Sequence, residues 1–203
     1  MPNLIVKNYT TRKFLDRYGL LNGESRILNA GSSSVRHGSK CVNVDIQRKH
    51  DVDVVCDIQS LPVPPAQFDA IVCSAVLQYC QAPERVAGEF HRVLKPGGYV
   101  FLDTPWVQPY CPDTPDRFRY SEVALRTIFK HFEIVEIGPS IRPGSAFAML
   151  GVHIAGSMTH NRYINFLLRK AAFVVLFPFR WIRTADESKT AGAFYMICRK
   201  PPC

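Results

Sequence analysis

Three short apolar runs near the start of the chain each end beside a small or acidic residue that could contact a ligand. The runs cover residues 26–30, 41–45 and 52–57, and the residues at their ends are Gly31, Asp45 and Asp57. A turn that begins with glycine lets backbone groups approach a bound molecule without a Cβ in the way. A carboxylate such as Asp45 can accept both hydroxyl protons of a ribose diol, and Asp57 suits the exocyclic amino group of an adenine. Together these residues predict a nucleoside site.

Phosphate-binding motifs are absent from the same stretch. It contains neither the Gly-Lys-Ser/Thr of a phosphate loop nor the G-x-G-x-x-G that places a pyrophosphate on a helix N-terminus. The sequence therefore favours a nucleoside without a polyphosphate, and S-adenosylmethionine is the common one. A nicotinamide-dependent oxidoreductase is a further option, disfavoured because it would need the missing pyrophosphate turn.

The elements that position these residues are predicted to be parallel strands. Runs rich in β-branched residues that end in Gly/Ser or Asp are typical of strands with functional loops at their carboxyl ends, where ligands of open α/β sheets bind. Residues 68–74 are predicted as the buried central strand, and residues 8–21 as a leading helix. The connections 31–40 and 46–53 are shorter than a usual crossover with its helix, so we expect shortened early helices.

Six motifs, taken in order, resemble those of one enzyme family. They are Ile27-Leu28-Asn29-Ala30-Gly31-Ser32-Ser33, Val44-Asp45, Cys56-Asp57-Ile58 with Leu61-Pro62, Phe68-Asp69-Ala70-Ile71-Val72-Cys73, Ala75-Val76-Leu77-Gln78-Tyr79, and Phe90-His91-Arg92-Val93-Leu94-Lys95-Pro96-Gly97-Gly98. On these motifs, residues 24–132 resemble the class I S-adenosylmethionine-dependent methyltransferases of the compact methyltransferase type 11 kind. The resemblance implies a Rossmann-like, three-layer α/β fold with a mostly parallel seven-stranded sheet. Residues 132–137 and 193–198 would be strands six and seven, the last antiparallel and at the edge.

The resemblance also implies which residues hold the cofactor S-adenosylmethionine. They are Asn29, Gly31, Ser32, Ser33, Asp45, Ile46, Asp57, Ile58 and Ser74. Asn29 stands where the family has an acid, and Ser33 stands where it has a second glycine. Gln78 and Tyr79 replace a Glu-His pair. These departures leave an alternative hypothesis, a degenerate and non-catalytic methyltransferase-like binding protein.

A loop rich in proline and aromatic residues, 104–120, follows the predicted fifth strand, 99–103. Such a loop at a strand's carboxyl end is a candidate lid over an acceptor substrate. Methyl transfer from a sulfonium needs alignment in a dry cavity, and a hydroxyl acceptor also needs a base. The candidate catalytic residues are Asp103, Tyr110 and Asp116. We predict O- or N-methyl transfer to a small-molecule acceptor near this loop, with a sugar or a lipid-linked intermediate as the favoured class.

A segment of large apolar residues lies in an insertion, residues 138–189, between the last two predicted strands. Residues 164–182 are too few for a comfortable membrane span, and Arg169, Lys170 and Arg180 interrupt or flank the apolar part. Three interpretations compete: a helix that packs on the core or dimerises, a helix at a membrane surface, or a wall of a lipophilic substrate pocket. Packing is favoured because long apolar helices are usually buried.

The bulk properties fit one domain spanning residues 1–203. The formal net charge of +8 could attract an anionic substrate or a membrane surface, but no run of Lys and Arg is dense enough to predict a nucleic-acid partner. The seven cysteines include no C-x-x-C pair, and the six histidines share no ligand spacing, so we predict no metal site. Unpaired cysteines and the lack of a signal-peptide pattern predict a cytoplasmic protein, with membrane association as an option.

Overall fold

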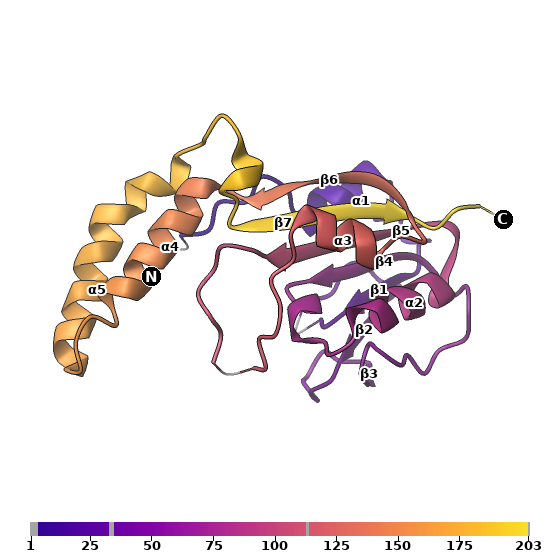
Figure 1. Ribbon diagram of the computed structural model, residues 1–203. Helices are drawn as coiled ribbons and strands as arrows, with labels where there is room; N and C mark the ends of the chain where they lie inside the picture. The colour runs from indigo at the N-terminus through magenta and orange to yellow at the C-terminus, as the bar shows by residue number, and fades with distance from the viewer. Residues whose placement is uncertain (1–3, 33–34, 113, 203) are drawn as a thin grey trace.

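The chain folds around a mixed β-sheet with helices on both faces (Figure 1). The computed structural model describes residues 4–32, 35–112 and 114–202. Within these residues the sheet has seven strands in the order β3-β2-β1-β4-β5-β7-β6. The strands are β1 (Ile27–Ala30), β2 (Cys41–Asp45), β3 (Val54–Val55), β4 (Phe68–Ser74), β5 (Leu94–Pro105), β6 (Glu133–Ile141) and β7 (Ala193–Arg199). The pairs among β1 to β5 are parallel, whereas β7 runs antiparallel to both β5 and β6.

This sheet confirms the predicted Rossmann-like α/β class with an antiparallel last strand. The predicted edge position of that strand is wrong, because β7 pairs on both sides and β6 forms the edge. The leading helix is also shorter than predicted. Thr10 caps its start by accepting a hydrogen bond from the Lys13 N–H, and Gly19 follows it in a left-handed conformation (φ +63°).

Successive side chains of each strand point to opposite faces and build two separate cores. Leu28 and Ile71 point to the face covered by α2 and α3, whereas their neighbours Ile27 and Val72 point to the face covered by α1. The helices of these layers are α1 (Thr11–Arg17), the 3-10 turn η1 (Leu77–Tyr79), α2 (Pro83–Val93) and α3 (Glu122–Ile128). The sheet is therefore buried on both faces, and its carboxyl edge is left for a ligand.

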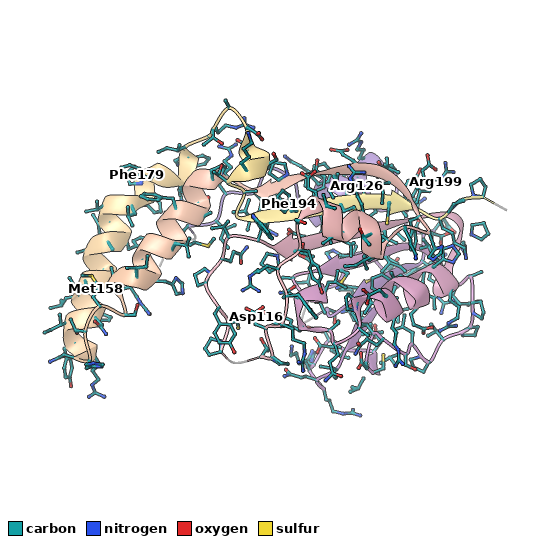
Figure 2. All side chains as sticks on the ribbon, in the orientation of Figure 1. Asp116, Arg126, Met158, Phe179, Phe194 and Arg199 are labelled. Carbon is teal, nitrogen blue, oxygen red and sulfur yellow. The ribbon has the colours of Figure 1, made fainter. Side chains whose placement is uncertain are left out.

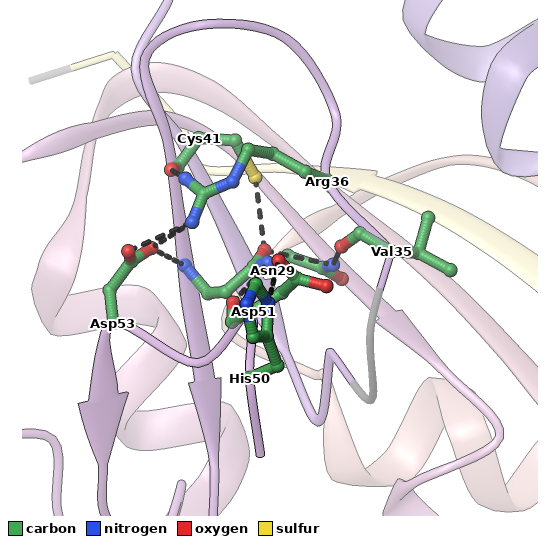
Figure 3. Close-up of polar contacts among 8 residues, drawn as sticks. Asn29, Val35, Arg36, Cys41, His50, Asp51 and Asp53 are labelled. Atoms are coloured by element: carbon green, nitrogen blue, oxygen red, sulfur yellow. Dashed lines mark hydrogen bonds and ion pairs between the residues drawn. The ribbon is translucent and has the colours of Figure 1, made fainter.

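A polar network occupies the two short connections between the first three strands (Figure 3). Asn43 of β2 is fully buried; its side chain accepts a hydrogen bond from Asn29 Nδ2 (3.2 Å) and donates one to the Asp51 carbonyl (2.8 Å). The Asp53 carboxylate accepts from the Asn43 N–H (2.8 Å) and from Arg36 Nη2 (2.8 and 3.0 Å). The described residues of these connections contain no helix. Side chains instead supply hydrogen-bond partners to the backbone.

Between β6 and β7 the chain forms a helical hairpin that projects beyond the end of the sheet (Figure 1). Its elements are α4 (Pro143–Ala155), α5 (Arg162–Leu176) and the 3-10 turns η2 (Phe177–Trp181) and η3 (Glu187–Lys189). The preferred prediction, an apolar helix packed on the core, is wrong: α5 has no buried residue, and its main contacts are with α4 and η2. Gly144 allows the close approach of η2, since a Cβ there would lie 2.0 Å from the Phe179 carbonyl oxygen. No helix of the described residues is long and apolar enough to cross a bilayer.

Candidate functional site

A cavity of about 540 Å³ opens at the carboxyl edge of β1, β2 and β4. Its volume lies in the range of small-molecule sites, and its position is where ligands of open α/β sheets bind. Six of the nine residues predicted to hold a cofactor line it: Gly31, Asp45, Ile46, Asp57, Ile58 and Ser74. They come from the ends of four different strands, so the fold brings them into one crevice.

Gly31 makes the turn after β1 and has a left-handed backbone conformation (φ +72°). The N–H groups of Gly31 and Ser32 donate to the Val44 carbonyl (2.8 and 3.0 Å), which ties the turn to β2. A Cβ on residue 31 would lie 2.2 Å from Cγ2 of Val76, a residue of the cavity wall. Both the conformation and the lack of space therefore require glycine here.

Asp45 ends β2 at the cavity, and its side chain is nearly buried. Its Oδ1 accepts a hydrogen bond from the Gln47 N–H (2.9 Å), and its Oδ2 lies 3.3 Å from Lys49 Nζ. These contacts fix the carboxylate at the mouth of the crevice. A carboxylate so placed can accept hydrogen bonds from two vicinal hydroxyl groups.

Two isoleucines supply apolar surface to the same cavity lining. Ile46 is 68% exposed although it is a large apolar residue, whereas Ile58 is buried. Asp57 accepts hydrogen bonds from the N–H and side-chain amide of Gln59 (2.9 and 2.8 Å), and Gln59 accepts one from the Ala82 N–H (2.7 Å). The loop after β3 is thus attached to the start of α2. The lining combines an apolar surface for a flat ring with acceptors near its edge.

Three of the predicted cofactor residues have other surroundings. The buried Asn29 amide donates to the Val35 carbonyl (2.7 Å) and to Asn43, so it braces the turn after β1 (Figure 3). Ser32 is also buried, and its hydroxyl has no hydrogen-bond partner among the described residues. Ser33 lies outside the described residues. A role of these three in cofactor binding stays a prediction.

A second cavity, of about 180 Å³, adjoins the first and shares Ala75 and Tyr79 with it. Ala75 has a positive φ (+57°), a strained conformation for alanine of the kind that clusters at functional sites. Polar and charged residues supply much of the lining: Lys7, Gln78, Asp103, Gln108, Asp116 and Arg119. The side-chain oxygen of Gln78 is buried without a hydrogen-bond partner among the described residues. This second cavity therefore suits a polar molecule.

Asp103 lies near the carboxyl end of β5 and is buried at the second cavity. Lys7 forms an ion pair with its Oδ2, and the Ser140 hydroxyl donates to its Oδ1 (2.6 Å). The two partners hold the carboxylate in one orientation. Neither was indicated by the sequence, because Lys7 and Ser140 are 96 and 37 positions away and carry no motif.

The other two catalytic candidates lie on the 104–120 loop. Asp116, labelled in Figure 2, lies on this loop. It forms a bidentate ion pair with Arg119 and accepts a hydrogen bond from the Cys111 N–H (3.1 Å), so it braces the loop. The hydrogen bonds from Arg119 lower the pKa of the Asp116 carboxyl group, which makes it a weak base. Tyr110 is 66% exposed and lines neither cavity. Asp103 and Asp116 both line the second cavity and are both ion-paired, whereas Tyr110 is exposed. The geometry therefore favours the two carboxylates over Tyr110, and a catalytic role for either stays a prediction.

Part of the chain is similar in sequence to known methyltransferases. Residues 28–102 match the family model described as "Methyltransferase domain". A malonyl-[acyl-carrier protein] O-methyltransferase of Marinomonas sp. (strain MWYL1) is 38% identical over 56 residues, which cover 27% of this chain and 21% of that protein. The matched part is thus about a fifth of the length of that curated relative.

Solved structures share the fold at low sequence identity. A putative sarcosine dimethylglycine methyltransferase from Galdieria sulphuraria superposes with a TM-score of 0.62 at 14% identity, over 94% of this chain and 83% of that one. Phosphoethanolamine N-methyltransferase 2 of Haemonchus contortus, in complex with S-adenosyl-L-methionine, has a TM-score of 0.60 at 15% identity, over 94% and 52%. These structures show that the fold is shared, and the match of residues 28–102 agrees with the resemblance to methyltransferases.

Proposed function

We infer that this chain is a class I S-adenosylmethionine-dependent methyltransferase, because its residues 28–102 match the methyltransferase domain and its sheet has the fold of such enzymes. One observation carries the inference. A single cavity unites Gly31, Asp45 and Asp57, the residues from which a nucleoside site was predicted.

The cavity fits the adenosine part of S-adenosylmethionine in chemistry and in size. Asp45 would accept the two ribose hydroxyl protons, and Asp57 would face the amino group of the base. The exposed side chain of Ile46 offers an apolar surface that a flat base would cover, and Ile58 adds a second apolar side chain to the lining. The turn at Gly31 lets the backbone approach the ligand closely.

The cofactor, when bound, supplies a methyl group on an activated sulfonium. The remaining task of the chain is to align an acceptor atom with that methyl group and to exclude water. We propose the second cavity as the acceptor site, because it meets the cofactor cavity at Ala75 and Tyr79. Asp103 would accept the proton of an acceptor hydroxyl, while Lys7 and Ser140 keep its carboxylate oriented.

The size of the second cavity limits what it can hold. Its volume of about 180 Å³ is below the usual range for a whole drug-sized ligand. We therefore propose that it takes only the reactive end of an acceptor, and that a sugar or the polar end of a lipid-linked intermediate fits its polar lining. An oxygen acceptor is favoured, because Asp103 offers a carboxylate for a hydroxyl proton and the relative from Marinomonas is named an O-methyltransferase.

The proposal is tested by the binding of S-adenosylhomocysteine, measured by calorimetry and by thermal shift, with NADH as the comparison ligand. We expect S-adenosylhomocysteine alone to raise the melting temperature, since a ligand that binds only the native state stabilises it. Asp45→Asn should weaken binding by about 100-fold, because two hydrogen bonds to a charged acceptor contribute about 3 kcal/mol.

Asp51→Asn is the matched control. It makes the same chemical change six positions along the chain, in a residue that does not line the cavity. We expect the affinity of this variant to stay within about twofold of that of the wild type. Failure of the wild type to bind S-adenosylhomocysteine, or an equal loss in both variants, would refute the assignment of the cavity.

A further inference from the structure

The helical hairpin, defined here as residues 143–182, presents to solvent a stripe of mostly apolar side chains. On α5 the exposed residues Tyr163, Phe166, Leu167, Lys170 and Val174 follow a helical spacing of three and four. Leu167 is 65% exposed and Val174 is 72% exposed. The opposite side of the helix packs on α4, since a Cβ on Gly151 would lie 2.4 Å from Leu176. The stripe is therefore the outer face of the hairpin.

Positive charge is concentrated on the same part of the chain. The hairpin, residues 143–182, contains four Lys or Arg residues and no Asp or Glu. Because the formal net charge of the chain is +8, the hairpin carries half of it. Two of the cations lie on the outer face itself: Arg162 stacks over the Tyr163 ring (4.8 Å) and Lys170 over the Phe166 ring (5.3 Å).

The hairpin also has an aromatic belt at its base. Trp181 is exposed, and the guanidinium groups of Arg142 and Arg180 lie 5.6 and 5.0 Å from its ring centre. Tryptophan and arginine side chains prefer the interface between lipid and water, where the apolar part of each side chain contacts lipid and its polar or charged end contacts water. Figure 2 shows Met158 at the far end of the hairpin and Phe179 nearer its base.

We propose that this hairpin docks the protein on the surface of an anionic lipid bilayer, with the outer stripe of α5 in the interface. The positive charge of the hairpin favours an anionic membrane over a second copy of the chain as the partner of this face. A second copy would bring two acid-free basic hairpins together, whereas anionic lipid headgroups supply the opposite charge. The 15 residues of α5 extend about 22 Å, less than the ~30 Å of a hydrocarbon core, so the helix lies along the surface and does not span it.

The hairpin is connected to the strands that line the second cavity, so its docking would also position that cavity. β6 and β7 connect to the hairpin through Ile141 and Ala193, and both residues line the second cavity. A docked hairpin would therefore place this cavity near the lipid surface. If the second cavity is the acceptor site, as proposed above, this arrangement favours an acceptor presented by the membrane.

The test is sedimentation of the full chain with vesicles of phosphatidylcholine alone and of phosphatidylcholine with about one third phosphatidylglycerol. We expect binding to the anionic vesicles, weaker binding to the neutral ones, and release at high salt. Trp181 emission should shift to the blue on binding, and Trp181→Phe should remove the shift. Equal binding to both vesicles, or no binding, would overturn the proposal.

Two pairs of variants locate the contact. The double variant Arg162→Gln with Lys170→Gln should lower the vesicle partition coefficient by about 30-fold, because each cation lost should lower it roughly fivefold. The control double variant Arg126→Gln with Lys130→Gln, also at exposed positions, should leave the partition coefficient unchanged. Val174→Ser should lower it about tenfold, whereas Val123→Ser, at 73% exposure on α3, should not.

All of these substitutions are at exposed positions, and unchanged binding of S-adenosylhomocysteine will show that the variants are folded. Equal losses in the test and control pairs would overturn the assignment to the hairpin. A dimer in light scattering that Val174→Ser dissociates would identify a second copy as the occupant and would also overturn it.

Discussion

The substitution Gly31→Ala tests how the turn after β1 is held against the cavity wall. Alanine at φ +72° costs about 1 kcal/mol relative to glycine. Its Cβ would also lie 2.2 and 2.7 Å from the two Cγ atoms of Val76, so Val76 must move, and overpacking of this kind costs about 1–3 kcal/mol. The sum, about 2–4 kcal/mol, corresponds to a melting temperature lower by roughly 4–16 °C for a chain of this size.

Gly19→Ala separates the two contributions. Gly19 has a similar backbone conformation (φ +63°), but a Cβ there would meet nothing within 4 Å. We expect this variant to lose only about 1 kcal/mol, because it carries the conformational cost alone. Chemical denaturation of both variants under identical conditions measures the difference.

A double-mutant cycle with Val76→Ala completes the test, because that change removes both Cγ atoms and leaves only the Cβ, 3.0 Å away. The double variant should be more stable than the sum of the single effects by about 1–2 kcal/mol. Additive effects, or equal losses in Gly31→Ala and Gly19→Ala, would refute the steric argument.

Two further predictions concern stability. Hydrogen bonds from Arg92 lower the pKa of Glu89 below its usual value of 4.5, so the stability that this pair contributes is present above pH 4.5 and is lost as the pH falls through the folded-state pKa. The melting temperature of the wild type should therefore fall more steeply below pH 4.5 than that of Arg92→Gln, and parallel curves would contradict this. Asn43→Ala removes three side-chain hydrogen bonds of a fully buried residue and should cost about 2–3 kcal/mol in denaturant unfolding. Asn22→Ala removes two exposed hydrogen bonds and should cost less than about 1 kcal/mol, so equal costs would exclude burial as the reason.

The local signals of the sequence determined most of the sheet and the edge where a ligand binds. The runs that end at Ala30, Asp45 and Ser74 form strands with those same ends. Strand ends are encoded locally, because β-branched runs followed by Gly, Ser or Asp need no distant partner to be recognised. Four of the six predicted residues that line the cofactor cavity lie at these strand ends or directly after them: Gly31, Asp45, Ile46 and Ser74. Asp57 and Ile58 follow β3 by two and three positions, because that strand is limited to Val54–Val55.

Other features depended on contacts between distant parts of the chain, which a local pattern does not contain. Lys7 reaches Asp103 only because the N-terminal segment lies beside Ile141 of β6. The Asn29 amide donates a hydrogen bond to Asn43 because that side chain lies beside it in the next strand, a partner that the motif did not indicate. The apolar helix α5 has the composition of a buried element, yet the sheet is already covered on both faces, so α5 packs mainly against α4 and η2. The sequence by itself determined which residues are apolar and where strands end. The tertiary structure decided which polar side chains meet and which apolar face stays exposed, because these two features depend on how other segments fill the core.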